Sequence, residues 1–203
     1  MTDNMATRPI SERFNHLYNL ISSERFFIKQ GLDNDIPFFI CPYKPGESAA
    51  MQGMIDQLAN RLSQSGLKIL EINLYDLSIE ILKENGDWEW YLKEETSMSK
   101  QELKEELQSI LDIETVLVPG IAQKMKKDNF DLMFLSGAGE VFPYIRSHNV
   151  LNNLQSIVKD IPVLMFFPGE YTYSPESGAS LELFGRLHDD KYYRAFNIYH
   201  CEI

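Results

Sequence analysis

Short apolar runs that alternate with helical patterns restrict the fold of this chain more than any other feature. Residues 37–41 are apolar at consecutive positions, and the run stops at Pro42. Strands that are apolar on both faces are typical of a parallel sheet covered by helices on its two sides. Further strands are expected at 68–73, 131–135, 162–167 and 194–199. The alternation predicts an α/β fold: a single domain with a central, mostly parallel sheet of about five strands and helices on both faces.

Helical segments fill the rest of this domain, which we expect to span residues 1–203. An N-terminal helical segment is expected at about 10–30, and an acidic helical insertion at about 75–128. Within the insertion, Ser99 precedes Glu102 by three residues, which is the spacing of a capping box at a helix start. The insertion therefore lies between the second and third strands.

The expectations after the third strand depend on proline and glycine. A helical pattern covers 141–158, with a break near Pro143 or at His148 and Asn149. The fourth strand is expected to end at Pro168, followed by a turn-rich stretch over 171–179.

Negative charge is concentrated in one part of the chain. The formal net charge is −11, and the stretch from Glu71 to Glu114 holds 13 acidic and 4 basic residues, a net −9. Binding to a nucleic-acid backbone depends on Lys and Arg displacing counterions, so we expect no direct DNA binding. A basic protein partner fits this charge, and a solvated helical face explains it equally without a partner.

The composition also predicts the cellular setting. No charged start is followed by an apolar signal region, and no apolar run approaches the ~20 residues that a membrane span needs. We therefore expect a cytoplasmic protein that does not contact a membrane. The two cysteines, Cys41 and Cys201, are expected to be reduced thiols. The sequence leaves the oligomeric state open.

The loop after the first strand occupies the place of a phosphate-binding loop. That motif requires G-x-x-x-x-G-K-[ST], whereas here Lys44 precedes Gly46 and Ser48. The fold is therefore expected to resemble a P-loop-type fold without the Walker A motif. We expect no ATP hydrolysis.

Two other motifs have structural explanations that compete with functional ones. Residues 136–139 form half of a dinucleotide fingerprint, but a tight turn accounts for the same glycines. His188, Asp189 and Asp190 are metal-ligand types, but an Asp pair is also an ordinary helix cap. No G-x-S-x-G motif is present. We assign no catalytic residue, no metal ligand and no cofactor, and we expect no enzyme.

Several long blocks of sequence together resemble one known family. They cover 36–42, 70–76, 139–152, 166–171 and 183–196, and one of them reads Phe166-Phe167-Pro168-Gly169-Glu170-Tyr171. In this order they resemble the BrxB family of BREX bacteriophage-exclusion systems, from about Ser11 to Tyr199. The resemblance implies a role in antiviral defence and phage resistance, beside a large ATPase, a DNA methyltransferase and an alkaline-phosphatase-like component.

Two functions follow from the resemblance and the missing motifs. The first is a non-enzymatic adaptor or regulatory subunit that binds another BREX protein. The alternative is a degenerate nucleotide-binding or metal-dependent domain that uses the strand-end loops.

Ligands of parallel sheets sit beyond the carboxyl ends of the strands, so the loops there are the expected binding surface. Tyr and Arg near the chain end are typical of protein contacts, although the same residues also suit a lid on the last strand. The candidate residues are Glu140, Arg146, His148, Asn149, Glu170, Tyr171, Arg186, His188, Asp189, Asp190 and Tyr192.

Overall fold

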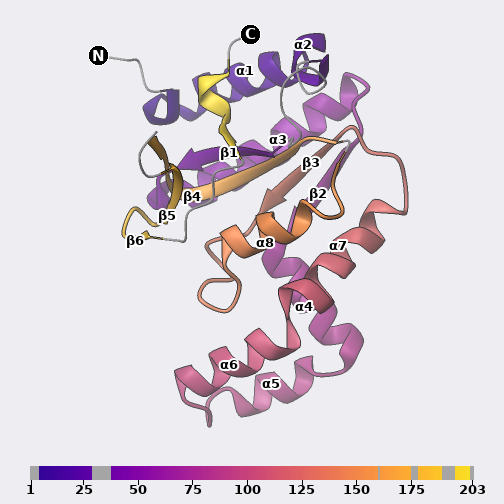
Figure 1. The fold of residues 1–203 in the computed structure, drawn as a ribbon, viewed down its shortest axis with the longest axis vertical. Coiled ribbons are helices and arrows are strands. Elements are labelled where there is room, and N and C mark those ends of the chain that lie inside the picture. Colours follow the sequence, from indigo (N-terminus) through magenta and orange to yellow (C-terminus); the bar gives the residue numbers. More distant parts are fainter. Residues whose placement is uncertain (1–4, 29–37, 160, 175–177, 189–194, 202–203) are drawn as a thin grey trace.

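Five parallel strands form the centre of the structure, a computed structural model that describes residues 5–28, 38–159, 161–174, 178–188 and 195–201 (Figure 1). They are β1 (Phe38–Tyr43), β2 (Ile69–Asn73), β3 (Leu132–Ser136), β4 (Val163–Ser174) and β7 (Phe196–Asn197). Their order across the sheet is β2-β3-β4-β1-β7. The prediction of a mostly parallel sheet of about five strands is therefore confirmed.

The last strand lies beside the first, as expected for a P-loop-type strand order. Phe39 of β1 pairs with Phe196 of β7. The short helix η5 (Ile198–His200) follows β7, and Cys201 behind it packs against the same apolar cluster that includes Cys41. The two thiols thus belong to the same edge region of the sheet, and both are free cysteines.

Helices cover both faces because successive side chains of each strand point to opposite sides. On one face, α1 (Ile10–Ile21), α2 (Glu24–Ile28) and α3 (Ser48–Gln64) enclose a core that includes Phe134 and Phe166, whose ring centroids lie 5.1 Å apart. On the other face, Met133 and Leu135 pack in a second core with α4 (Leu74–Asn85), α7 (Val118–Met125) and α8 (Ser147–Leu154).

The acidic insertion folds into a series of helices between β2 and β3. After α4 come α5 (Trp88–Glu94), α6 (Lys100–Ile110) and the π-helical turn η4 (Ile113–Leu117), which leads into α7. The predicted capping box starts α6: the Ser99 hydroxyl accepts the Glu102 N–H, and the Glu102 carboxylate accepts the Ser99 N–H. Helices α5 and α6 project away from the sheet (Figure 1). No helix in the described part of the chain is both long and apolar enough to cross a membrane.

The expected end of the fourth strand at Pro168 is wrong. Strand β4 continues to Ser174 and forms an antiparallel hairpin with β5 (Gly178–Leu183), which in turn pairs with β6 (Leu187–His188). Much of the stretch expected to be rich in turns is therefore strand. Gly169 makes this possible, because a Cβ there would overlap the carbonyl oxygen of Glu182 on β5.

The helix expected over 141–158 is also shorter than its pattern suggests. Residues 137–146 form successive turns, in which the Ile145 N–H donates to the Val141 carbonyl, and α8 begins only at Ser147. The predicted break near Pro143 is confirmed. His148 and Asn149 lie inside α8 and do not interrupt it.

Two glycines give a test of this architecture. Gly169→Ala should destabilise the fold by about 2 kcal/mol, because the new methyl group meets a backbone carbonyl that cannot move freely. Gly53→Ala, in α3 with nothing within 4 Å of the new Cβ, should instead stabilise the fold by about 0.5–1 kcal/mol. Chemical denaturation measures both. Equal stability of the two variants would contradict the close approach of β4 and β5.

Candidate functional site at the carboxyl edge of the sheet

The loops beyond β3 and beyond β5 meet at the carboxyl edge of the sheet. A Cβ on Gly139 would lie 2.9 Å from Pro168 Cγ and 3.1 Å from Phe184 Cε1, so the three segments are in close contact. The rings of Phe142 and Phe184 also pack edge to face, with their centroids 6.3 Å apart. Two of the loops expected to form a common surface therefore converge.

Aromatic residues lie at or beyond the carboxyl ends of the strands, on four segments of the chain. We call them the edge rim: Tyr43 at the end of β1, Tyr75 at the start of α4, Phe142 and Tyr144 of the loop after β3, and Phe184 of the turn after β5. Tyr75 is 40% exposed and Phe184 is 38% exposed. The rim thus combines large apolar area with access to solvent.

Glu140 is the charged residue within this rim. Burial raises the pKa of the Tyr43 phenol, and the charge of Glu140 adds to that increase. Burial also raises the pKa of Tyr144 to about 12, with smaller contributions from Tyr75 and Glu140. Both phenols therefore stay neutral donors near neutral pH. Glu140 itself is exposed and lies within electrostatic reach of both phenols.

The structure exposes several of the candidate residues. Those with exposed side chains are Glu140, Arg146, Asn149, Glu170 and Arg186. Arg186 lies in the turn after β5, two residues beyond Phe184, which places it beside the edge rim. Tyr171 is half-buried, and its hydroxyl donates a hydrogen bond of 2.5 Å to the Ala195 carbonyl. That bond ties β4 to the segment before β7.

The remaining candidate residues are not exposed loop residues of the described structure. His148 is only 4% exposed and faces the interior from α8, so the expectation that it belongs to a binding surface is wrong. His148 lies on the buried face of the short helix α8, whereas the sequence suggested that it belongs to a loop. His188 lies in β6, opposite Glu182. Asp189, Asp190 and Tyr192 lie outside the described residues.

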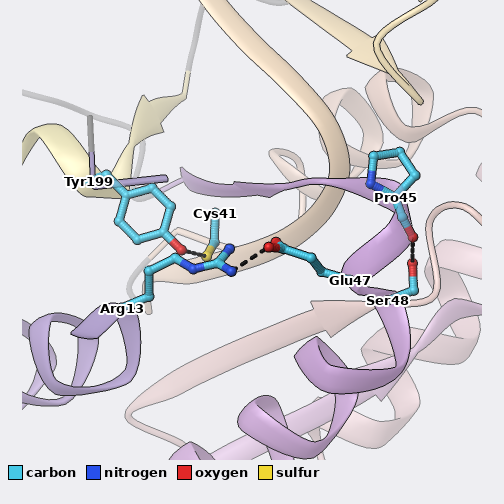
Figure 2. Close-up of polar contacts among 6 residues, drawn as sticks. All are labelled: Arg13, Cys41, Pro45, Glu47, Ser48 and Tyr199. Atoms are coloured by element: carbon cyan, nitrogen blue, oxygen red, sulfur yellow. Dashed lines mark hydrogen bonds and ion pairs between the residues drawn. The ribbon is translucent and has the colours of Figure 1, made fainter. Parts of the chain in front are cut away.

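The loop after β1 is closed by hydrogen bonds within itself. The Glu47 N–H donates to the Lys44 carbonyl at 2.8 Å in the short helix η3 (Pro45–Glu47). The N–H and the hydroxyl of Ser48 both donate to the Pro45 carbonyl, the hydroxyl at 2.7 Å (Figure 2). A phosphate-binding loop instead directs such N–H groups outward to its ligand.

A buried arginine on α1 holds this loop in place through an ion pair. Arg13 of α1 is 1% exposed, and its Nη2 donates to Glu47 Oε2 at 2.8 Å (Figure 2). Glu47 immediately precedes α3, so this ion pair ties α1 to the start of α3. Sequence reasoning missed this pair. The available signal was the spacing of Arg13 four residues before Leu17, on the buried face of the amphipathic helix.

Cys41 and Tyr199 complete the buried group around Arg13. The Cys41 thiol donates to the Tyr199 hydroxyl at 3.2 Å (Figure 2). Burial raises the pKa of Cys41 to about 12, although the Tyr199 hydrogen bond and the charge of Arg13 act in the opposite direction. Burial likewise raises the pKa of Tyr199. A thiol in this state is a poor nucleophile, because the thiolate is the reactive form.

Within the residues that the structure describes, no three or more His, Cys, Asp or Glu side chains are grouped so that they hold a metal ion.

Comparisons with known proteins point to one family. A family model described as "BREX protein BrxB" matches residues 70–198. The chain is 35% identical over 199 residues to a BREX protein BrxB of Bacillus cereus (strain H3081.97), across 94% of this chain and 98% of that protein. It is 28% identical over 191 residues to a BREX protein BrxB of Escherichia coli O9:H4 (strain HS), across 94% and 92% of the two chains. No solved structure matches the chain.

The closed loop after β1 leads to a prediction about ATP. The purified protein should show no ATP hydrolysis above background, because the N–H groups of Glu47 and Ser48 are already bonded and no lysine stands at the start of α3. A phosphate-release assay measures this. Turnover that disappears in Lys44→Ala would contradict our interpretation of the loop.

The two cysteines should differ in reactivity. At pH 8 in the native protein, a thiol reagent should modify Cys201, which is half-buried, well before Cys41, whose pKa of about 12 keeps it protonated. In denaturant, both should react at similar rates. Mass spectrometry of labelled peptides distinguishes them, and equal native rates would show that Cys41 is accessible.

Proposed function

Since the chain belongs to the BrxB family and is thereby a component of a BREX antiviral system, we propose that it acts there as a non-enzymatic adaptor or regulatory subunit. In this proposal it binds another BREX protein, such as the alkaline-phosphatase-like component, the ATPase or the methyltransferase. The binding surface is the edge rim together with Arg186.

The contact between the loop after β3 and the turn after β5 carries this proposal. The rings of Phe142 and Phe184 pack edge to face, and a Cβ on Gly139 would lie 3.1 Å from Phe184, so aromatic side chains of the two segments meet at one place. Tyr and Arg are enriched at the centres of protein interfaces, where they contribute most of the binding energy. The rim therefore has the composition of an interface.

The support under this surface is rigid. The turn after β5 is held by antiparallel pairing from Gly169↔Leu183 to Ser174↔Gly178, and the Phe184 N–H donates to the Pro168 carbonyl at 2.8 Å. Preformed surfaces lose less conformational entropy on binding than flexible ones. The hairpin thus holds the backbone of Phe184 and Arg186 through hydrogen bonds.

Arg186 fits a contact role better than a structural one. Its side chain is exposed, and it forms no ion pair with another residue that the structure describes. A residue of this kind contributes little to folding, so its loss should affect binding alone.

The state of the loop after β1 favours a binding role over nucleotide chemistry. The ion pair between Arg13 and Glu47 holds the start of α3, and the N–H groups of Glu47 and Ser48 are bonded within the loop. Removing Glu47 from Arg13 would leave a buried charge without its partner, which costs several kcal/mol.

Truncation of the rim tests the proposal. Phe184→Ala and Arg186→Ala should each weaken binding to the cognate BREX partner by about 30-fold, the equivalent of ~2 kcal/mol at a buried interface centre. The assay is a pull-down against each separately expressed BREX protein, followed by titration of the one that binds. Phage resistance should fall in cells that carry either variant.

Trp90→Ala is the matched control, because Trp90 is a large exposed side chain on α5 with 48% exposure and lies outside the rim. It should leave partner affinity unchanged. If both rim variants bind normally, the interface lies elsewhere. If their melting temperature falls by several degrees, Phe184 and Arg186 stabilise the fold and do not report on binding.

A further inference from the structure

A groove runs along the outer side of α4, on a different part of the molecule from the hairpin. It has a volume of about 490 Å³. We call it the α4 groove, and its lining residues are Tyr75, Asp76, Ile79, Glu80, Lys83, Glu84 and Trp88.

The floor of this groove is apolar. Tyr75 and Ile79 lie four residues apart and therefore share one side of α4. Trp88, at the start of α5, closes the far end, and Lys83 Nζ lies 5.5 Å from the centre of its ring. Such a floor suits apolar side chains of a bound segment, spaced as on one face of a helix.

The border of the groove is acidic. Asp76, Glu80 and Glu84 form a row at four-residue spacing along α4. Asp76 and Glu80 also line an adjoining hollow of about 290 Å³, which adds the carboxylates of Asp56 and Glu71. The Lys124 ammonium group pairs with Glu80, and Lys83 lies at Trp88, so carboxylates outnumber lysines around the two hollows.

We propose that the α4 groove binds a basic amphipathic segment of a partner protein, with apolar side chains on Tyr75, Ile79 and Trp88 and Lys or Arg side chains against Asp76 and Glu84. The groove adjoins the edge rim, with which it shares Tyr75, and it goes beyond the adaptor function because it specifies the chemistry of an occupant.

Charge decides between the possible occupants. Nucleic acid is repelled by the row of carboxylates. A second copy of this chain carries the same net charge of −11, so association of two copies through this face brings like charges together. A basic segment alone satisfies both the apolar floor and the acidic border.

The two tryptophans of the chain allow a direct test, because Trp88 lines the groove and Trp90 does not. The probe is a synthetic amphipathic peptide with Lys and Leu at helical spacing, titrated into the Trp90→Phe protein. Its binding should shift the emission of Trp88 and should weaken as salt is raised. The matching Glu and Leu peptide should not bind, and binding of both peptides alike would overturn the proposal.

Variants then locate the site. Glu84→Lys should weaken peptide binding by about fivefold or more, as expected from the loss of an ion pair and the gain of a repulsion. Ile79→Gln should weaken it through the apolar floor without a change of charge. Glu105→Lys, on the exposed side of α6, changes the net charge equally and should bind as the parent protein does.

Two outcomes would overturn the proposal: equal weakening by Glu84→Lys and Glu105→Lys, or full binding by both groove variants with unchanged melting temperatures. Phe184→Ala should bind the peptide normally. This separates failure of the α4 groove from failure of the edge rim.

Discussion

Parallel pairing of β1 with β4 is the constraint on which the rest of the structure depends. Their register runs from Phe38↔Val163 to Tyr43↔Pro168, so both strands deliver their following segments to the same edge. The core strands on either side repeat this direction. Because every loop beyond the carboxyl ends starts from one line, residues far apart in sequence meet there. The edge rim is a consequence of strand direction more than of any local motif.

The buried Arg13 of α1 holds the loop after β1 in place through an ion pair. Its charge requires a partner, and Glu47 supplies one at the start of α3. The same contact holds α1 against the loop and compensates the charge of the buried guanidinium group. A single ion pair thus links the N-terminal helix to the loop after β1.

Apolar runs and helical spacing were sufficient to predict the parallel strands, the helices on both faces and the capping box at Ser99. These features depend on local sequence patterns, and tertiary contacts do not change them. The extension of β4 was not predictable in this way. A Pro-Gly pair usually indicates the end of a strand, and only the pairing with β5 continues β4 beyond it. The burial of His148 also depends on tertiary packing. The candidate surface was predicted as a set of loops. Its aromatic members Phe142 and Phe184 were not predicted, because their pairing depends on a contact between two loops that are far apart in the sequence.

Strand β4 belongs to two sheets at once. Its first half, from Val163, is hydrogen-bonded between β1 and β3, and its second half is one arm of the exposed hairpin. No turn or loop separates the two halves, because the chain continues as strand through Gly169. The hairpin is therefore an extension of the strand that lies in the middle of the core sheet, and the backbone of β4 sets the position of the hairpin relative to that sheet.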